Sequence, residues 1–240
     1  MNTYQLVREK DHLFVTLPDG SRQLLDTGAG YSLGAAGSVT VAGVTVPVTQ
    51  RYLGASVRRL RKLVGADFSG LLGLDVLGQL DAVYDLPAGT VTFSRRPVLA
   101  VQGEAVSLRA GPFGLPLFTG WVRGRPRTWA LDTGAQLSYF LPEEDDLSVF
   151  PFAGKAPDFF PLTGKYTVDT YRVPVTLGES NLEVKLKAAV PPRLLGKLLS
   201  GWGGLVGSEL FVGRKVGFFP LRKQLVVGPG EEAAAGERAA

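Results

Sequence analysis

Two aspartates occupy identical four-residue strings, Asp-Thr-Gly-Ala, at residues 26–29 and 132–135. Each string ends an extended apolar approach. Two carboxyl groups that are brought face to face cannot both ionise cheaply, so they share one proton. One group can then act as a base while the other acts as an acid near neutral pH. Asp26 and Asp132 are therefore a candidate catalytic pair for acid and base chemistry.

The duplication extends upstream of the two aspartates. They are 106 positions apart (132 − 26), and this offset sets residues 12–17 against residues 118–123. Both segments have the composition of strands, and each leads into a turn, Pro-Asp-Gly in the first half and Gly-Arg-Pro in the second. Asp-Gly is a strong hairpin signal. Each half is therefore predicted to contain a hairpin, a strand and then the carboxylate loop.

A second repeat lies downstream of each aspartate. Residues 68–73 match residues 202–207 as an apolar-apolar-Gly segment, and the acidic Asp75 and Glu209 follow two places later. The same offset, 134 (207 − 73), relates two β-rich segments that close the halves, residues 84–93 and 218–227. The second half thus carries 28 more residues (134 − 106) between its carboxylate loop and its apolar-apolar-Gly segment.

These motifs resemble those of the retropepsin-like aspartic protease family of the bacterial type, with both lobes in one chain as in the pepsin-type arrangement. The resemblance covers residues 4–228 and depends on two Asp-Thr-Gly-Ala copies, each followed by an apolar-apolar-Gly segment. It implies an all-β fold of two pseudo-symmetric lobes with the active site at their interface. It also implies an endopeptidase in which Asp26 and Asp132 activate a water, without a covalent intermediate or a cofactor.

The residues beside the aspartates are expected to support the two catalytic loops: Thr27, Gly28, Ala29, Thr133, Gly134 and Ala135. The glycines permit a tight turn and keep a Cβ out of the substrate path. In the family resembled, the threonine hydroxyls are buried and bond to the opposite loop. Pepsin-type enzymes usually have a hydroxyl where this chain has the alanines. Without a hydroxyl to stabilise the charged form, the pair should have a raised pKa, and activity is expected at mildly acidic or near-neutral pH.

Such proteases cover the bound peptide with a β-hairpin flap. Residues 159–168 have the needed form, an apolar arm, a Gly-containing tip and an alternating return arm, with Gly164, Lys165 and Tyr166 as candidate substrate contacts. Tyr166 could equally be an ordinary strand aromatic. In the first half, residues 30–37 are too few for a helix and a flap. A single flap from the second lobe is therefore expected.

Length and composition agree with two small β lobes. The 240 residues, 45% of them hydrophobic, allow lobes at 1–100 and 101–229, the first short and flapless, followed by a disordered tail at 230–240. Glycine and proline are spread through the chain, as suits short strands joined by tight turns. Few segments have a helical pattern, notably residues 56–64 and 142–149.

The residue inventory excludes several chemistries. The chain has no cysteine, so it has no disulfide, no thiolate nucleophile and no cysteine metal site. Its single histidine, His12, lies in a strand-like run, which favours a structural residue over a member of a Ser-His-Asp triad. No metal site is expected.

Net charge +4 raises the question of nucleic acid, but the basic run at 58–62 is typical of a solvated face, as is the acidic run at 143–146. No secretory signal and no membrane-length apolar stretch is visible, so we expect a cytoplasmic protein without membrane or nucleic-acid partners. We expect a monomer with an intramolecular pseudo-dimer, acting on peptide or protein substrates. The alternatives are a catalytically silent peptide-binding or assembly module and, third, a basic nucleic-acid-associated protein. Two intact aspartates favour the enzyme.

Overall fold

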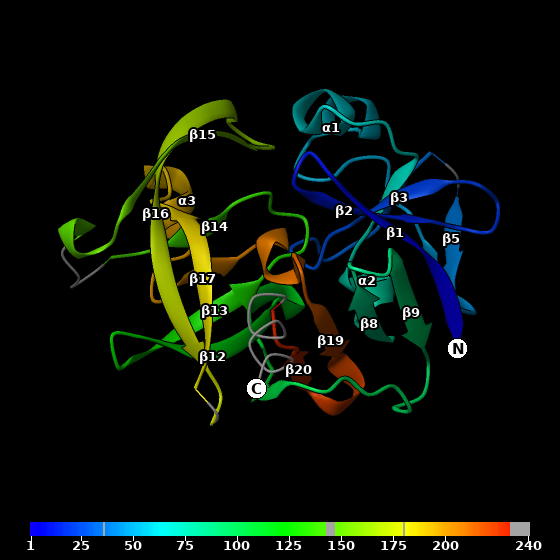
Figure 1. The fold of residues 1–240 in the computed structure, drawn as a ribbon. Coiled ribbons are helices and arrows are strands. Elements are labelled where there is room, and N and C mark those ends of the chain that lie inside the picture. The colour runs from blue at the N-terminus through cyan, green and yellow to red at the C-terminus, as the bar shows by residue number, and fades with distance from the viewer. Residues whose placement is uncertain (36, 143–146, 180, 231–240) are drawn as a thin grey trace.

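The computed structural model describes residues 1–240 except 36, 143–146, 180 and 231–240. It is an all-β protein with two lobes, as expected, and two large sheets form most of it (Figure 1). The ten-stranded sheet contains, in spatial order, β10 (Glu104–Ser107), β20 (Gln224–Val227), β19 (Lys215–Phe219), β8 (Asp81–Asp85), β9 (Thr90–Ser94), β1 (Asn2–Glu9), β2 (His12–Thr16), β3 (Arg22–Leu25), β7 (Gly70–Leu72) and β4 (Leu33–Gly34).

The second lobe is built on an eight-stranded sheet. Its spatial order is β11 (Arg109–Ala110), β12 (Pro116–Val122), β13 (Arg125–Leu131), β18 (Gly204–Val206), β14 (Ser138–Phe140), β17 (Leu182–Ala189), β16 (Gly164–Leu177) and β15 (Phe152–Phe160). A small hairpin of β5 (Ser38–Val41) and β6 (Val44–Pro47) belongs to the first lobe. The helices are α1 (Val57–Val64), α2 (Leu74–Leu77) and α3 (Arg193–Leu198), with 3-10 turns at Pro112–Gly114, Leu147–Val149, Ser208–Phe211 and Pro220–Arg222.

The segments that close the two halves pair with each other. Strand β8 runs antiparallel to β19, with Val83 opposite Gly217, so the ten-stranded sheet contains strands from both halves. One buried apolar cluster likewise includes residues of both halves, such as Leu25 and Leu131. The lobes therefore share a core beneath the catalytic loops. Because the sheet crosses residue 100, the division of the chain at that point stays a prediction.

Strand alternation places the catalytic strands between two apolar layers. In β3, Leu25 packs in the shared core while Leu24 packs in a first-lobe cluster on the opposite face. In β13, Leu131 and Ala130 divide in the same way, and Ala130 packs in the corresponding second-lobe cluster. Successive side chains of a strand point to opposite faces, so each strand is held on both sides as it enters its aspartate loop.

The two upstream hairpins differ in loop length. In the first, Thr16 pairs with Arg22, whereas in the second Val122 pairs with Arg125 and leaves only two residues in the loop. As a result Phe14, opposite Leu24, corresponds to Leu117, opposite Ala130. The sequence alignment of residues 12–17 with 118–123 is therefore wrong by three positions. The structural counterpart of His12 is Leu115, not Phe118.

Helix α1 forms where the sequence predicts it. Ser56 caps its first turn by accepting from the N–H of Arg59, and Gly65, with φ of 76°, ends it. Leu60 and Val64 are its buried residues. The second expected helix, at 142–149, appears as the 3-10 turn Leu147–Val149, and residues 143–146 lie outside the described residues. Residues 231–240 of the expected tail also lie outside them.

Candidate active site

The two aspartate loops meet between the lobes and are supported by matching backbone bonds. Strand β7 lies parallel to β3, and the N–H of Asp26 donates to Leu72 O at 3.0 Å. Strand β18 lies parallel to β13, and the N–H of Asp132 donates to Val206 O at 2.9 Å. The apolar-apolar-Gly segments are therefore the strands behind the catalytic loops.

The threonines of the two motifs bond to each other's loops. Thr27 Oγ1 donates to Leu131 O at 2.8 Å and accepts from the N–H of Thr133 at 3.0 Å. Thr133 Oγ1 donates to Leu25 O at 3.0 Å and accepts from the N–H of Thr27 at 3.0 Å. Both side chains are fully buried. These four bonds are the cross-bonds that the family resemblance implies, and they fix one loop against the other.

Each motif glycine lies directly against the opposite carboxylate. The N–H of Gly28 donates to Asp26 Oδ1 at 2.9 Å, and that of Gly134 to Asp132 Oδ1 at 3.0 Å. A Cβ on Gly28 would overlap the carboxylate of Asp132, and one on Gly134 would overlap that of Asp26. Glycine at these positions therefore has a more immediate role than clearing the substrate path, because it lets the two carboxyl groups approach each other.

Burial is the main influence on the ionisation of the pair. It raises the pKa of Asp132, and it raises the pKa of Asp26 well above the usual range together with the negative charge of Asp132. The two carboxyl groups are also hydrogen-bonded to each other. Ala29 and Ala135 supply no hydroxyl to the carboxylates. A pair in this environment shares one proton more readily than two isolated carboxyl groups do.

An outer layer of polar residues also follows the repeat. Ser32 Oγ accepts from the N–H of Gly73 at 3.0 Å, and Ser138 Oγ accepts from the N–H of Gly207 at 3.1 Å. The two serines are 106 positions apart, as the aspartates are, so the offset could have revealed them. The acidic residues that follow the two apolar-apolar-Gly segments have different hydrogen-bond partners. Asp75 accepts from Ser32 at 2.6 Å, whereas Glu209 accepts from the N–H of Lys187 at 2.8 Å.

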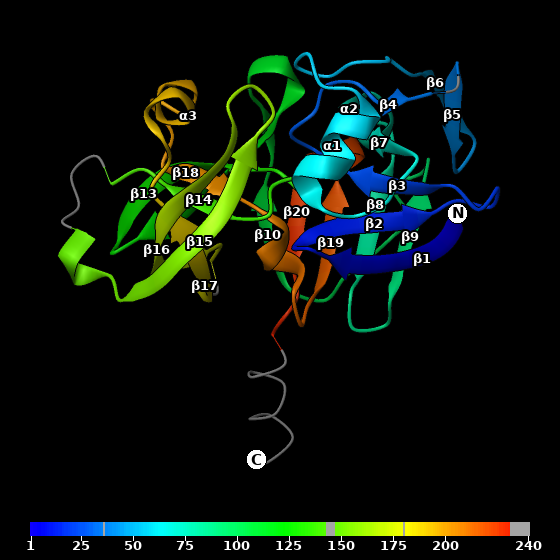
Figure 2. The same ribbon diagram turned by 90° about the horizontal axis from the view of Figure 1, so that it is seen from above.

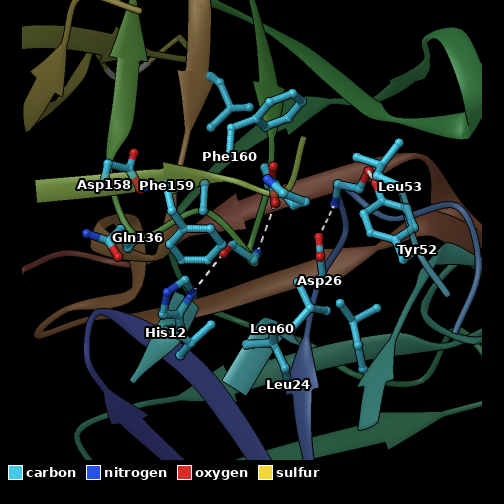
Figure 3. Close-up of a pocket in the computed structure, with 18 of the residues that line it drawn as sticks. His12, Leu24, Asp26, Tyr52, Leu53, Leu60, Gln136, Asp158, Phe159 and Phe160 are labelled. Atoms are coloured by element: carbon cyan, nitrogen blue, oxygen red, sulfur yellow. Dashed lines mark hydrogen bonds between the residues drawn. The ribbon is translucent and has the colours of Figure 1, made fainter. Parts of the chain in front are cut away.

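A cavity of about 120 Å³ lies over the two aspartates (Figure 3). Asp26 and Asp132 form part of its lining, and most of the other lining residues are apolar. The first lobe contributes His12, Leu24, Gly28, Tyr52, Leu53, Leu60, Val64 and Leu71, and the second lobe contributes Gly134, Ala135, Gln136, Tyr139, Leu195 and Leu205 together with Asp158, Phe159, Phe160, Pro161 and Tyr166.

The segment expected to be a flap forms a long hairpin of β15 and β16. Figures 1 and 2 show it reaching from the second lobe toward α1 of the first. Gly164, with φ of 85°, follows the turn at its tip. Tyr166 lines the cavity and its hydroxyl lies 2.9 Å from that of Tyr139. Lys165 is exposed and does not line this cavity. Of the three flap candidates, the structure brings only Tyr166 to the site.

The hairpin is bonded to both lobes in a closed position. Gln136 donates to Pro157 O at 2.6 Å within the second lobe, and Arg59 of α1 donates to Pro161 O at 3.3 Å. Phe159 packs against the apolar cluster of the first lobe. Asp158 is buried, accepts from Tyr139 and from the N–H of Phe159, and has its pKa raised by burial to about 6.

The first lobe contributes a shorter cover that the sequence analysis did not anticipate. Tyr52 and Ala55 exchange two backbone bonds, which leaves Leu53 (φ 47°) and Gly54 (φ 75°) at the tip of a tight turn. Tyr52 donates to Gly28 O at 3.2 Å, and Leu53 lines the cavity (Figure 3). An aromatic residue before Leu-Gly was the available signal. Among the described residues, no group of three or more His, Asp or Glu side chains could hold a metal ion.

No protein-family model matches the chain, and no curated protein matches it in sequence. Solved structures do resemble it. Basic 7S globulin from soybean is 10% identical with a TM-score of 0.53, covering 98% of this chain and 96% of the globulin. Aspartic proteinase from Irpex lacteus is 12% identical with a TM-score of 0.51, covering 96% of this chain and 97% of the proteinase.

The chain therefore has the pepsin-like two-lobed fold over nearly its whole length. One of the two neighbours is named a proteinase and the other a globulin, so this likeness leaves activity to be argued from the site. In the part of the chain that the structure describes, no helix has the length and apolar character needed to cross a membrane.

Proposed function

We propose that the protein is an aspartic-type endopeptidase of the retropepsin-like class. The observation that carries the proposal is the meeting of Asp26 and Asp132 on two matching loops at the floor of a cavity. Their neighbours leave them little freedom, since four threonine bonds and the two glycines fix the loops. Burying two carboxyl groups side by side is unfavourable, so a site that fixes them in this arrangement is suited to proton transfer.

The pair would act on a water held between the carboxyl groups. The ionised carboxylate takes a proton from this water while the water oxygen attacks the carbonyl carbon of the peptide bond. The protonated carboxyl donates its proton to the carbonyl oxygen, which gives a neutral diol intermediate. As the diol collapses, the ionised carboxylate takes a proton from one diol hydroxyl, the carbon-nitrogen bond breaks to leave a carboxylic acid, and the leaving amine takes its proton from the protonated carboxyl group. Each carboxyl group thus ends the cycle ready for the next water.

Substrate entry requires the hairpin to lift. A cavity of about 120 Å³ holds a few waters but no extended peptide. Phe159 and Phe160 of the hairpin line this cavity, so a peptide must displace them. Lifting breaks the Arg59 and Gln136 bonds to the hairpin and uncovers the aspartates. Because both aspartates belong to one chain, we propose that the enzyme works as a monomer. We further propose that it acts on peptide or protein substrates within the cytoplasm.

Incubation with a mixed peptide library across pH 2 to 8 tests the proposal. The parent protein should cleave, with its highest activity at mildly acidic or near-neutral pH, because burial raises the pKa of both aspartates. The variants Asp26→Asn and Asp132→Asn should each lose activity by at least about 10⁴-fold, since neither amide can transfer a proton in this way. A rate profile that peaks below about pH 3 would contradict the environment described above.

The second candidate function is a catalytically silent peptide-binding module. The small cavity and the hairpin bonds to both lobes favour it, because they limit the space for an extended peptide above the aspartates. Binding of library peptides without cleavage at any pH, with the same affinity in Asp26→Asn, would support this second function. Cleavage that disappears in both aspartate variants would exclude it.

A further inference from the structure

His12 reaches the catalytic loop of the opposite lobe. It lies at the start of β2 in the first lobe, its side chain is 1% exposed, and its Nδ1 is 2.8 Å from Gly134 O. A carbonyl oxygen can only accept, so Nδ1 must carry the hydrogen. This bond joins the first lobe to the loop of Asp132. Figure 3 shows His12 beneath the ring of Phe159 at one side of the cavity.

The other ring nitrogen is left with an unused lone pair. Burial lowers the pKa of His12 to about 4, and the opposing effects of Gly134, Asp11 and Gln136 do not outweigh it, so the ring is neutral at mildly acidic pH. With the hydrogen on Nδ1, the Nε2 atom is an acceptor. It is buried and makes no hydrogen bond of good geometry among the described residues, although the Gln136 side chain lies close enough to raise the pKa of the ring. An orphaned buried acceptor that lines a cavity calls for a ligand or a structural explanation.

The surroundings of Nε2 show what covers it. The ring of Phe159 from the hairpin lies against His12, with ring centroids 5.8 Å apart. Gln136 is the polar neighbour on this side: it donates one amide N–H to Pro157 O, and its side chain also interacts with the His12 ring. Both of these contacts belong to the closed hairpin, so lifting the hairpin exposes His12 to whatever enters the cavity.

The second lobe has no histidine at the equivalent position. Continuing the register in which Phe14 matches Leu117 sets His12 against Leu115, which lies just before β12. Leu115 is apolar and packs against the second-lobe cluster. The structural bond from Nδ1 to Gly134 O explains the donor of His12 but does not need an acceptor at Nε2.

We propose that His12 binds the substrate directly, with its Nε2 accepting a hydrogen bond from one backbone N–H of the peptide on the Asp132 side of the cleft. This inference rests on the proposed peptide substrate and sharpens it. An extended peptide presents its N–H groups alternately to the two sides, so only one of them meets Nε2. The peptide position facing His12 must then keep a free N–H, which excludes proline and N-methylated residues there.

A substrate series combined with His12 variants tests this contact. A cleaved peptide is prepared with a single N-methyl group at each successive position around the scissile bond. In the parent protein, one methylation should lower kcat/KM by about 5- to 50-fold more than the others, as expected for a buried acceptor left unpaired. In His12→Leu, which introduces the side-chain type of the second-lobe counterpart, the same methylation should lose this extra effect.

His12→Asn separates the two ring nitrogens. Its amide N–H can take the place of Nδ1 and keep the bond to Gly134 O, but it provides no acceptor at the position of Nε2. It should therefore retain the parent's pH profile and thermal stability while responding to N-methylation as His12→Leu does. If His12→Leu does not fold, His12→Asn carries the comparison alone. An equal response of the parent and both variants at every position overturns the inference.

The same series separates this inference from the proposed function. The dissociation constants of the peptides are also measured in the Asp26→Asn background, with and without the His12 substitutions. A position-specific coupling to His12 in these constants supports the inference even where the parent protein cleaves nothing, in which case only the proposed activity fails. Cleavage without coupling removes the role of His12 and leaves the activity intact. Absence of both peptide binding and cleavage overturns both.

Discussion

The two catalytic loops are near copies of each other, whereas the structures that cover them are not. The N–H groups of Asp26 and Asp132 donate to Leu72 O and Val206 O behind them, and their carboxylates accept from the N–H groups of their own glycines. Above the loops, the second lobe supplies the long β15–β16 hairpin and the first lobe supplies only the turn at Tyr52. The two loops must match each other for their carboxyl groups to meet. Closure of the site needs only one long hairpin, so the other half can be short.

The symmetric part is rigid because the threonines of each loop are bonded to the loop of the other lobe. Thr27 and Thr133 are fully buried, and their hydroxyls and N–H groups are satisfied across the interface. The covering part is held by fewer and more exposed bonds, such as that of Arg59 to Pro161. Elements that must move are drawn from the weakly held end of a structure. The catalytic loops thus position the two aspartates, whereas the structures that cover them control access to the site.

The largest expected effect comes from breaking the symmetric geometry at the glycines. Gly28→Ala and Gly134→Ala each place a methyl group against the opposite carboxylate. Because the carboxyl groups must then move apart, kcat/KM should fall by at least about 100-fold in both variants. Peptide cleavage assays on the purified variants measure this, with circular dichroism to show that they are folded.

Gly30→Ala is the matched control for this pair. A Cβ at that position would meet Phe113 O at 3.8 Å, an ordinary contact, and Gly30 does not have a positive φ. Its activity should stay within about threefold of the parent, as for a substitution without a clash. Full activity in Gly28→Ala with loss only in Gly134→Ala would show that the two loops are not equivalent.

A smaller effect should come from the asymmetric part, at Asp158 in the hairpin. Folding raises the pKa of this carboxyl from 3.8 to about 6, chiefly by burial. Between these pH values the native protein binds more protons than the unfolded chain, so its stability falls as the pH rises through this window. Relative to Asp158→Asn, the parent should lose up to about 3 kcal/mol of unfolding free energy between pH 4 and pH 7.

Urea unfolding of both proteins at several pH values checks this difference. The comparison cancels the contribution of Asp26 and Asp132, which titrate in both proteins. The protection of the hairpin amides against hydrogen exchange, relative to their intrinsic rate at each pH, should also fall above pH 6 in the parent alone, because the ionised carboxylate is poorly solvated beside Tyr139. Parallel stability curves for the two proteins would show that Asp158 does not titrate in this environment.

Local and repeated signals predicted much of this structure. The paired Asp-Thr-Gly-Ala strings placed the two aspartate loops, and the apolar-apolar-Gly segments placed the strands behind them. The helical pattern of residues 56–64 placed α1. The all-β, two-lobed class was confirmed. These features depend on residues close in sequence or on the internal repeat, and both are visible in one chain.

Features that depend on contacts between distant segments were missed. The alignment of the first hairpins failed because a loop of different length shifts the register, and sequence offsets do not show where a loop is shortened. His12 and Tyr52 reach the site only through the packing of β2 and of the turn after β6 against the loops. Neither residue has a counterpart in the repeat that would have drawn attention to it.

The smallest expected effect comes from removing the threonine hydroxyls that join the two loops. Thr27→Ala leaves Leu131 O and the N–H of Thr133 buried without partners, and Thr133→Ala does the same to Leu25 O and the N–H of Thr27. Each should lower the unfolding free energy by about 1–3 kcal/mol, while the serine variants, which keep the hydroxyl, should lose less. Because each hydroxyl bonds to the other threonine's N–H, the double alanine variant should cost less than the sum of the two. Urea unfolding of the four single variants and the double variant measures this, and strictly additive losses would mean that the two loops are held independently.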